Sequence, residues 1–252
     1  MSMESMTIPL LAGHGNIICF TTTRYGSNRE ILCREMNIPE ERLFVPCQTH
    51  GSEALIVDEP FLALSPAGQA DTLQGIDALI TALPKVCIAV ATADCVPILL
   101  YAPDKGVIAA VHAGWRGTVL QIAWKTVRRM VSQFGCAPSL MFAGMGPCIG
   151  REAFETGEEV VEAFRLAGAD MQQILDYCPK TNKPHIDLRE ANRLQLIETG
   201  LLPEHIETSG VCTYSSGDFF SARRQGIQCG RMLSGIIIPN RVSNPVRDSR
   251  RY

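Results

Sequence analysis

The sequence lacks any apolar run of about 18 residues, the length that a helix needs to cross a membrane. Residues 1–6 also lack the basic segment and apolar stretch with which a secretory signal peptide opens. With a net charge of −3 and a pI of about 6.0, the chain has no excess of positive charge for nucleic acid or an anionic membrane. We therefore expect a cytoplasmic protein that binds neither nucleic acid nor membranes.

The sequence has no Cys-x-x-Cys pair, although it contains ten cysteines. They are scattered along the chain, and several lie inside apolar runs, such as Cys19 within 17–20 and Cys87 within 86–88. A chain of 252 residues can also bury a sizeable core without covalent cross-links. We therefore expect free, mostly buried thiols in a reducing compartment rather than a disulfide framework.

Several catalytic motifs are missing as well. The chain has no GxxxxGK[ST] phosphate loop, no HExxH zinc helix, no GxSxG nucleophile turn and no combined HxE and PCxxC signature of cytidine-type deaminases. Residues 144–150 resemble a dinucleotide-binding loop, but their spacing is GxGxxxG and Pro147 interrupts it. No acidic residue follows at a strand end about twenty positions later, so we reject dinucleotide binding.

The apolar pattern predicts an α+β fold. Four segments, 77–81, 86–91, 97–101 and 107–111, show little polar alternation, as expected of strands covered on both faces. Residues 118–134 repeat apolar side chains at helical spacing, and Asp187 with Glu190 forms a capping-box-like start of a helix that ends before Gly200. The other predictions are strands at 16–22, 43–47, 53–57, 140–143, 208–213 and 232–238, helices at 27–36, 155–166 and 171–177, and a loop at 59–75. We expect one domain over residues 1–252, with a core of about 14–240 and helices and sheets in separate layers.

Two histidines and a cysteine lie at predicted element ends, beside glycine, proline or an acid. His50 lies in the turn 48–52, Cys95 precedes the strand at 97–101, and His112 follows the strand at 107–111. A hairpin of these two strands can bring its outer ends together, and with them Cys95 and His112. Imidazole and thiolate suit a metal such as zinc, and three protein ligands leave the fourth position open, as in catalytic sites. Spacing alone also allows that each residue is structural.

Two charged neighbours leave alternatives open. Asp94 either orients a ligand histidine or accepts hydrogen bonds from backbone donors in the turn before Pro97. Arg116, near the start of the predicted helix, either binds a phosphate or carboxylate or is a surface side chain.

Seven segments, in order over about residues 17–238, resemble the YfiH or PgeF family, which is also called the laccase-domain or multicopper-polyphenol-oxidase family. They are TTTRYG at 21–26, QTHG at 48–51, DALIT at 77–81, ADCVPI at 93–98, HAGWRGT at 112–118, GPCIG at 146–150 and FFSARR at 219–224. The HAGWRG string and the histidine–cysteine–histidine set are the most specific. The chain departs from the family in residues 25–28, where the loop after Arg24 is shortened.

The resemblance implies a layered α-β-β-α sandwich with mixed sheets and a zinc ion held by His50, Cys95 and His112. It also implies a purine nucleoside phosphorylase that cleaves adenosine, inosine and methylthioadenosine with phosphate, and that has adenosine deaminase activity. We expect a monomer or homodimer. The positions that match the family motifs predict substrate contacts from Arg24, Gln48, Asp94, Arg116, Cys148 and Arg223.

Other functions use the same residues. Cys95 can act as a thiolate nucleophile activated by His112, as in Cys-His hydrolases. The chain can also be a peptidoglycan-editing factor or a metal-stabilised scaffold, in which Cys148 would complete a structural zinc site with four ligands. Copper is the alternative metal, but a multicopper polyphenol oxidase needs many histidines and this sequence has five.

Overall fold

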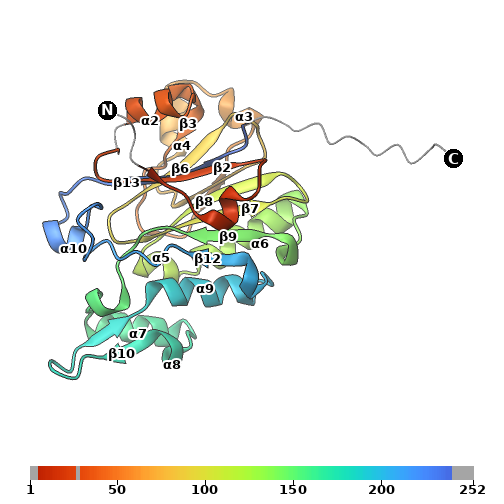
Figure 1. The fold of residues 1–252 in the computed structure, drawn as a ribbon. Helices are drawn as coiled ribbons and strands as arrows, with labels where there is room; N and C mark the ends of the chain where they lie inside the picture. Colours follow the sequence, from red (N-terminus) through yellow and green to blue (C-terminus); the bar gives the residue numbers. More distant parts are fainter. Residues whose placement is uncertain (1–4, 27–28, 240–252) are drawn as a thin grey trace.

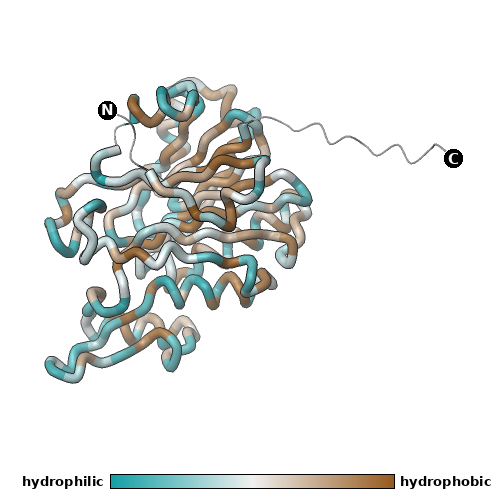
Figure 2. The backbone as a smooth tube through the Cα atoms, viewed as in Figure 1, coloured by the Kyte–Doolittle hydropathy of each residue, from teal (hydrophilic) through white to brown (hydrophobic). Residues whose placement is uncertain are grey.

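The computed structural model describes residues 5–26 and 29–239. Two large sheets lie in the middle of the molecule, and helices cover their outer faces (Figure 1). The backbone segments that run along the strands are hydrophobic, whereas hydrophilic segments lie in the peripheral loops and helices (Figure 2). Among the described residues, no helix combines the length and the hydropathy needed to cross a membrane.

The five-stranded sheet contains β1 (Ser5–Met6), β2 (Ile18–Thr22), β3 (Leu43–Phe44), β6 (Cys87–Thr92) and β13 (Met232–Ile237). The six-stranded sheet contains β4 (Ala54–Ile56), β5 (Ala78–Thr81), β7 (Val96–Ala102), β8 (Val107–Ala113), β9 (Phe142–Met145) and β12 (Ile206–Thr208). A separate hairpin joins β10 (Leu175–Tyr177) and β11 (Pro184–Ile186). The helices are α1 (Pro9–Ala12), α2 (Arg29–Glu35), α3 (Glu59–Leu62), α4 (Pro66–Thr72), α5 (Trp115–Val119), α6 (Ile122–Phe134), α7 (Glu158–Leu166), α8 (Met171–Ile174), α9 (Leu188–Glu198) and α10 (Ala222–Gln225).

The two sheets pack face to face through one set of alternating strand residues. The strand orders are β1-β2-β13-β6-β3 and β12-β9-β7-β8-β5-β4, with parallel and antiparallel pairs in each sheet. Leu79, Leu99 and Ile108 of the larger sheet form one buried cluster with Ile88 and Ile236 of the smaller sheet. Successive strand residues point to opposite faces, so the other half of each strand packs outward.

Helices cover both outward faces. On the larger sheet, Leu100 and Val111 pack with Val127 of α6 and Phe164 of α7. On the smaller sheet, α2 covers the strands and buries Leu32 in a third cluster. The predicted α-β-β-α fold with mixed sheets is confirmed.

The predicted loop at 59–75 is wrong, because this segment contains α3 and α4. Each helix has a proline in its first turn, where no intrahelical partner for the N–H is needed. Asp58 caps α3 by accepting a hydrogen bond from Phe61 N, and Ser65 caps α4 by accepting one from Gly68 N. Pro60 and Pro66 therefore lie at helix starts, and Gly68 lies inside α4.

Three other boundaries also differ from the predictions. The helix expected at 118–134 is divided into α5 and α6 at Gln121, which has a left-handed φ of 62°. Of the helix expected at 171–177, only the first turn forms, because 175–177 pair with β11 as a strand. The strand expected at 208–213 lies earlier, at β12, where Thr208 pairs with Met145 of β9. The predicted cap of α9 is confirmed, since Asp187 accepts a hydrogen bond from Glu190 N. The first residues of the helix predicted at 27–36 lie outside the described residues.

Candidate metal centre

The β7–β8 hairpin brings Cys95 and His112 together. In this hairpin Pro97 pairs with His112, so Cys95, which immediately precedes β7, lies beside the end of β8. His50 comes from the loop between β3 and β4. The ligand atoms of the three side chains lie within 4.8 Å of one another, and the two imidazole rings are 4.9 Å apart. We name these three residues the triad.

A buried carboxylate, that of Asp77, holds two members of the triad. Its Oδ1 lies 2.7 Å from His112 Nδ1 and accepts a hydrogen bond from His50 N at 3.0 Å. Its Oδ2 accepts hydrogen bonds from Gly51 N at 2.7 Å and Thr49 N at 3.2 Å. Because Nδ1 donates to the carboxylate, Nε2 is the ring nitrogen of His112 that remains available to Cys95 or to a metal. Asp77 therefore fixes both an imidazole ring and the turn that carries the other histidine.

The sequence did not reveal the role of Asp77. One alternative above assigned the histidine-orienting carboxylate to Asp94, but Asp94 accepts hydrogen bonds from Thr213 Oγ1 at 2.6 Å and Arg223 N at 2.7 Å. The available signal for Asp77 was an acid directly before the apolar strand β5, which pairs with the strand of His112.

Two glycines give the triad its space. A Cβ atom on Gly114 would lie 2.9 Å from Cys95 Sγ and 3.1 Å from His50 Cδ2. A Cβ atom on Gly117 would lie 2.9 Å from the carbonyl oxygen of Gly51. Since real Cβ contacts of this length require a neighbour to move, the glycines of the turn after β8 are needed for close packing against the triad.

Two turns at the site have left-handed backbone conformations at residues other than glycine. The φ of His50 is 61° and that of Asp94 is 95°. Such conformations are uncommon, persist where hydrogen bonds hold them, and concentrate at functional sites. Asp77 holds the first turn and Thr213 contacts the second, which supports a functional interpretation of both.

The electrostatics of the triad favour a thiolate at Cys95. Burial alone would raise the pKa of Cys95, but hydrogen bonds from His112 and His50 outweigh it and lower this pKa to about 6. Burial would lower the pKa of His112, but its hydrogen bonds to Asp77 and Cys95 raise it to about 9. Burial would also raise the pKa of Asp77, but His112 and backbone donors lower it below its ordinary value. A thiolate is the form of cysteine that binds metals.

The donor set fits a zinc ion. Two imidazole nitrogens and one thiolate are ordinary zinc ligands, and bonds of about 2.0–2.3 Å let three such atoms converge on one ion. Within the described residues, this is the only group of three or more histidine, cysteine, aspartate or glutamate side chains close enough to hold a metal. Cys148, the fourth ligand of the structural alternative, is not part of it.

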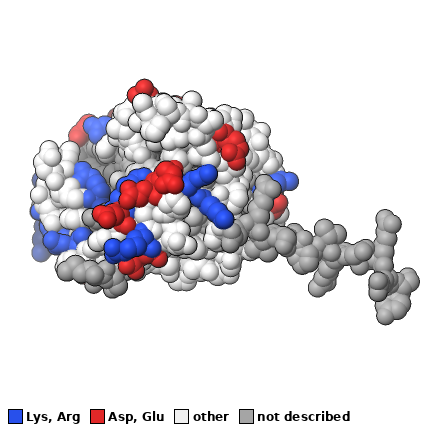
Figure 3. Space-filling model, turned by 90° about the horizontal axis from the view of Figure 1, so that it is seen from above, with Lys and Arg blue, Asp and Glu red and all other residues white. Residues whose placement is uncertain are grey.

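The triad lines a cavity of about 650 Å³. Three of the predicted substrate-contact residues, Gln48, Asp94 and Arg223, also line it, together with the aromatic side chains of Trp115 and Phe154. Figure 3 shows Lys and Arg side chains gathered at the left end of the molecule, the end at which α10 lies in Figure 1.

Gln48 and Arg223 also shape the wall of this cavity. The amide of Gln48 exchanges two hydrogen bonds of 2.8 Å with the backbone of Ala91. The guanidinium of Arg223 donates to the carbonyls of Ala153 at 3.3 Å and Glu155 at 2.9 Å. Since guanidinium has five N–H donors, Arg223 keeps donors for a ligand.

The other three predicted contact residues are not among those that line the cavity. Arg24 donates to a backbone carbonyl 3.3 Å away, and the Arg116 guanidinium lies 4.2 Å from the ring centre of Trp115. Cys148 is fully buried, and its sulfur accepts a hydrogen bond of 3.4 Å from Arg189. Substrate contacts of these three residues stay predictions.

Comparison with known proteins places the chain in a family. The family described as "Multi-copper polyphenol oxidoreductase laccase" matches residues 22–239. The chain belongs to this family. Its relatives include "Purine nucleoside phosphorylase" of Bacteroides thetaiotaomicron, which is 43% identical over 233 residues, 89% of this chain and 86% of that protein. "Adenosine deaminase RL5" from an unknown prokaryotic organism is 43% identical over 209 residues, 82% of this chain and 79% of that protein.

Solved structures of similar proteins have the same fold. YlmD from Geobacillus stearothermophilus superposes with a TM-score of 0.80 at 29% identity, over 89% of this chain and 93% of that chain. The hypothetical protein YfiH from Bacillus licheniformis superposes with a TM-score of 0.81 at 27% identity, over the same shares. The family resemblance predicted from the sequence is confirmed.

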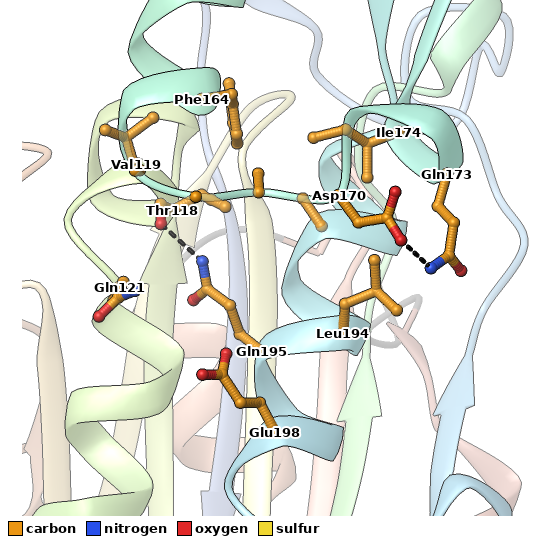
Figure 4. Close-up of a pocket in the computed structure, with 14 residues that line it drawn as sticks. Thr118, Val119, Gln121, Phe164, Asp170, Gln173, Ile174, Leu194, Gln195 and Glu198 are labelled. Carbon is orange, nitrogen blue, oxygen red and sulfur yellow. Dashed lines mark hydrogen bonds between the residues drawn. The ribbon is translucent and has the colours of Figure 1, made fainter.

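In this member of the laccase family, α9 contacts α5, the helix that follows β8 (Figure 4). Gln195 donates to the carbonyl of Thr118 at 2.7 Å. Asn192 donates to the Thr118 hydroxyl at 3.0 Å, and this hydroxyl donates to the carbonyl of Gly114 at 2.9 Å. A cavity of about 220 Å³ lies beside these contacts, and its lining does not include the triad. These hydrogen bonds connect α9 to Gly114, which packs against Cys95.

Proposed function

We propose that the chain is a zinc-dependent purine nucleoside phosphorylase with adenosine deaminase activity. The observation that carries the proposal is the His50–Cys95–His112 triad, which opens into a cavity of about 650 Å³. Two relatives that are 43% identical bear the names "Purine nucleoside phosphorylase" and "Adenosine deaminase RL5".

The cavity suits a nucleoside in size and in chemistry. Pockets for small molecules commonly have volumes of about 300–1,000 Å³ and combine apolar walls with a few polar groups. Trp115 and Phe154 supply aromatic faces for a purine, and Arg223 supplies positive charge for phosphate. Adenosine, inosine and methylthioadenosine are the nucleosides we propose.

Zinc, when bound, would supply a Lewis acid at this position. His50, Cys95 and His112 would hold it, and Asp77 keeps the His112 ring in the orientation that leaves Nε2 available. Arg223 would bind the phosphate that attacks the anomeric carbon of the ribose as the purine departs. Cytoplasmic localisation, a single domain and a monomeric or homodimeric state remain predictions.

Metal analysis and product chromatography test the proposal together. Purified protein should contain about one zinc ion per chain and should convert adenosine and phosphate to adenine and ribose phosphate, with inosine as a second product. His112→Ala should lose the metal and both activities. His185→Ala is the matched control, because His185 lies outside the triad and contacts the carbonyl of Arg151 at 3.0 Å. Full turnover by a metal-free His112→Ala protein would refute the proposal.

A Cys-His hydrolase is the second candidate, favoured by the hydrogen bonds from the two histidines to the Cys95 thiolate. Chelation and alkylation separate the two functions. If zinc is required, a strong chelator abolishes turnover and added zinc restores it. If Cys95 is the nucleophile, iodoacetamide abolishes turnover while the chelator has no effect.

A further inference from the structure

Two other cysteines, Cys148 and Cys212, lie side by side near the triad. They pair in an isolated parallel bridge, in which Thr213 N donates to Cys148 O at 3.0 Å and Cys148 N donates to Val211 O at 3.4 Å. Residues paired across neighbouring strands have Cα atoms about 4.8 Å apart. This separation lies within the range of about 4.4–6.8 Å that a disulfide spans. Both thiols are free.

A guanidinium and a backbone amide donate hydrogen bonds to these sulfurs. Arg189 Nε and Nη2 donate to Cys148 Sγ at 3.4 and 3.5 Å, and Arg189 also interacts electrostatically with Cys212. Gly150 N donates to Cys212 Sγ at 3.2 Å. Cationic side chains and backbone N–H groups are the features that make cysteines reactive.

The two thiols differ in accessibility and acidity. Cys148 is fully buried, whereas Cys212 is partly exposed. Burial raises the pKa of Cys148 to about 11. Burial would also raise the pKa of Cys212, but hydrogen bonds from Ser215 and Gly150 outweigh it and lower this pKa below its ordinary value. An accessible, acidic thiol beside a second thiol is the usual arrangement of a redox-sensing cysteine and its resolving partner.

The pair is connected to the triad through Asp94. Ile149 N, next to Cys148, donates to the carbonyl of Asp94 at 2.9 Å. The hydroxyl of Thr213, next to Cys212, donates to Asp94 Oδ1 at 2.6 Å. Asp94 immediately precedes the triad cysteine. The two segments that a disulfide would join are therefore segments that hold the turn of Asp94.

We propose that Cys148 and Cys212 form a peroxide-driven disulfide that lowers the activity of the neighbouring site. The Cys212 thiolate attacks one peroxide oxygen, the O–O bond breaks, and the other oxygen leaves as hydroxide or alkoxide. Cys212 is then a sulfenic acid. The Cys148 sulfur attacks the Cys212 sulfur, the S–S bond forms, and the sulfenic hydroxyl leaves as water with the Cys148 proton. The peroxide gains two electrons, and a thiol reductant reverses the change.

Peptide mapping tests the disulfide independently of any enzymatic activity. The zinc-loaded protein is treated with hydrogen peroxide, its free thiols are alkylated, and it is digested without reductant. We expect a cross-linked peptide pair joining Cys148 to Cys212 that disappears after dithiothreitol. Peptides that show Cys212 alkylated, or oxidised to sulfinic acid without the cross-link, would overturn the proposal.

Turnover of adenosine in two variants tests the effect on the site. Peroxide should lower wild-type turnover several-fold, and dithiothreitol should restore it. Cys212→Ser should be insensitive to peroxide. Cys178→Ser, which removes another partly exposed thiol with a lowered pKa, should respond like the wild type. Equal loss of turnover in Cys212→Ser, or a wild-type disulfide that leaves turnover unchanged, would refute the switch.

Discussion

Replacing Asp77 by asparagine perturbs the group that holds the triad. Asp77→Asn keeps the size of the side chain but turns one acceptor oxygen into an NH₂ donor. Oδ1 now receives two hydrogen bonds, from His112 Nδ1 and His50 N. Oδ2 receives three, from Gly51 N, Thr49 N and the Thr49 hydroxyl. Whichever oxygen position the NH₂ group takes, two N–H groups that now donate to the carboxylate face a donor instead of an acceptor.

The cost follows from these unpaired groups. Asp77 has no exposed surface, so water does not replace the lost acceptor. Each buried donor without an acceptor costs about 1–3 kcal/mol, so with two such donors we expect the free energy of unfolding to fall by about 2–6 kcal/mol. Loss of a carboxylate behind a ligand histidine typically lowers metal affinity by roughly 10–100-fold, and we expect that range here.

Two measurements separate stability from metal binding. Guanidinium unfolding in the presence of a chelator gives the stability of the metal-free chain, and competition with a chromophoric chelator gives the zinc affinity. The control is Asp58→Asn, because Asp58 caps α3 through Phe61 N at 3.0 Å and asparagine caps helices equally well. If Asp77→Asn unfolds within about 0.5 kcal/mol of the wild type and keeps its zinc affinity, Asp77 does not hold the triad.

Two further substitutions test the turn after β8. Gly114→Ala should lower zinc affinity and turnover at least tenfold, because its φ of −73° permits alanine while the new Cβ would lie 2.9 Å from Cys95 Sγ; Gly15→Ala, where a Cβ meets no atom within 4 Å, should be neutral in the same zinc titration. Thr118→Val should lower the free energy of unfolding by about 1–3 kcal/mol, because the lost hydroxyl bridges α9 and the turn. Thr126→Val, which removes a bond within α6 only, should cost less than about 1 kcal/mol in the same unfolding assay. If the two glycine variants bind zinc equally well, Gly114 does not make room for the triad. If the two threonine variants lose equal stability, the Thr118 hydroxyl does not connect α9 to this turn.

Most of the fold could be predicted because its central strands are buried on both faces. The segments at β5 to β8 contain almost no polar residues, and this pattern distinguishes them from exposed strands. The misassigned residues 59–75 contain prolines at the first turns of helices, which composition alone does not distinguish from loop prolines. The break at Gln121 escaped prediction because apolar spacing continues on both sides of it.

The site was predictable where local geometry determines it. Hairpin pairing of β7 and β8 follows from their spacing, so the approach of Cys95 and His112 could be derived from the chain. His50 could not be placed in this way, because its loop connects a strand of one sheet to a strand of the other. Asp77 was missed because its contact with His112 depends on the order of strands, which the sequence does not specify.

The positions of the histidines favour a single metal ion over the multicopper site that the family description names. His50 and His112 belong to the triad, and the other three histidines contact aromatic rings or a backbone carbonyl elsewhere: His14, His185 and His205. Two imidazoles and one thiolate serve one ion, whereas several coppers need many more imidazoles. The same three ligand types also occur in blue-copper sites, usually with a distant axial methionine, but no methionine is among the described residues that line this cavity. We therefore expect purified protein to contain zinc, and copper bound in stoichiometric amounts with a blue-copper absorption band would contradict this inference.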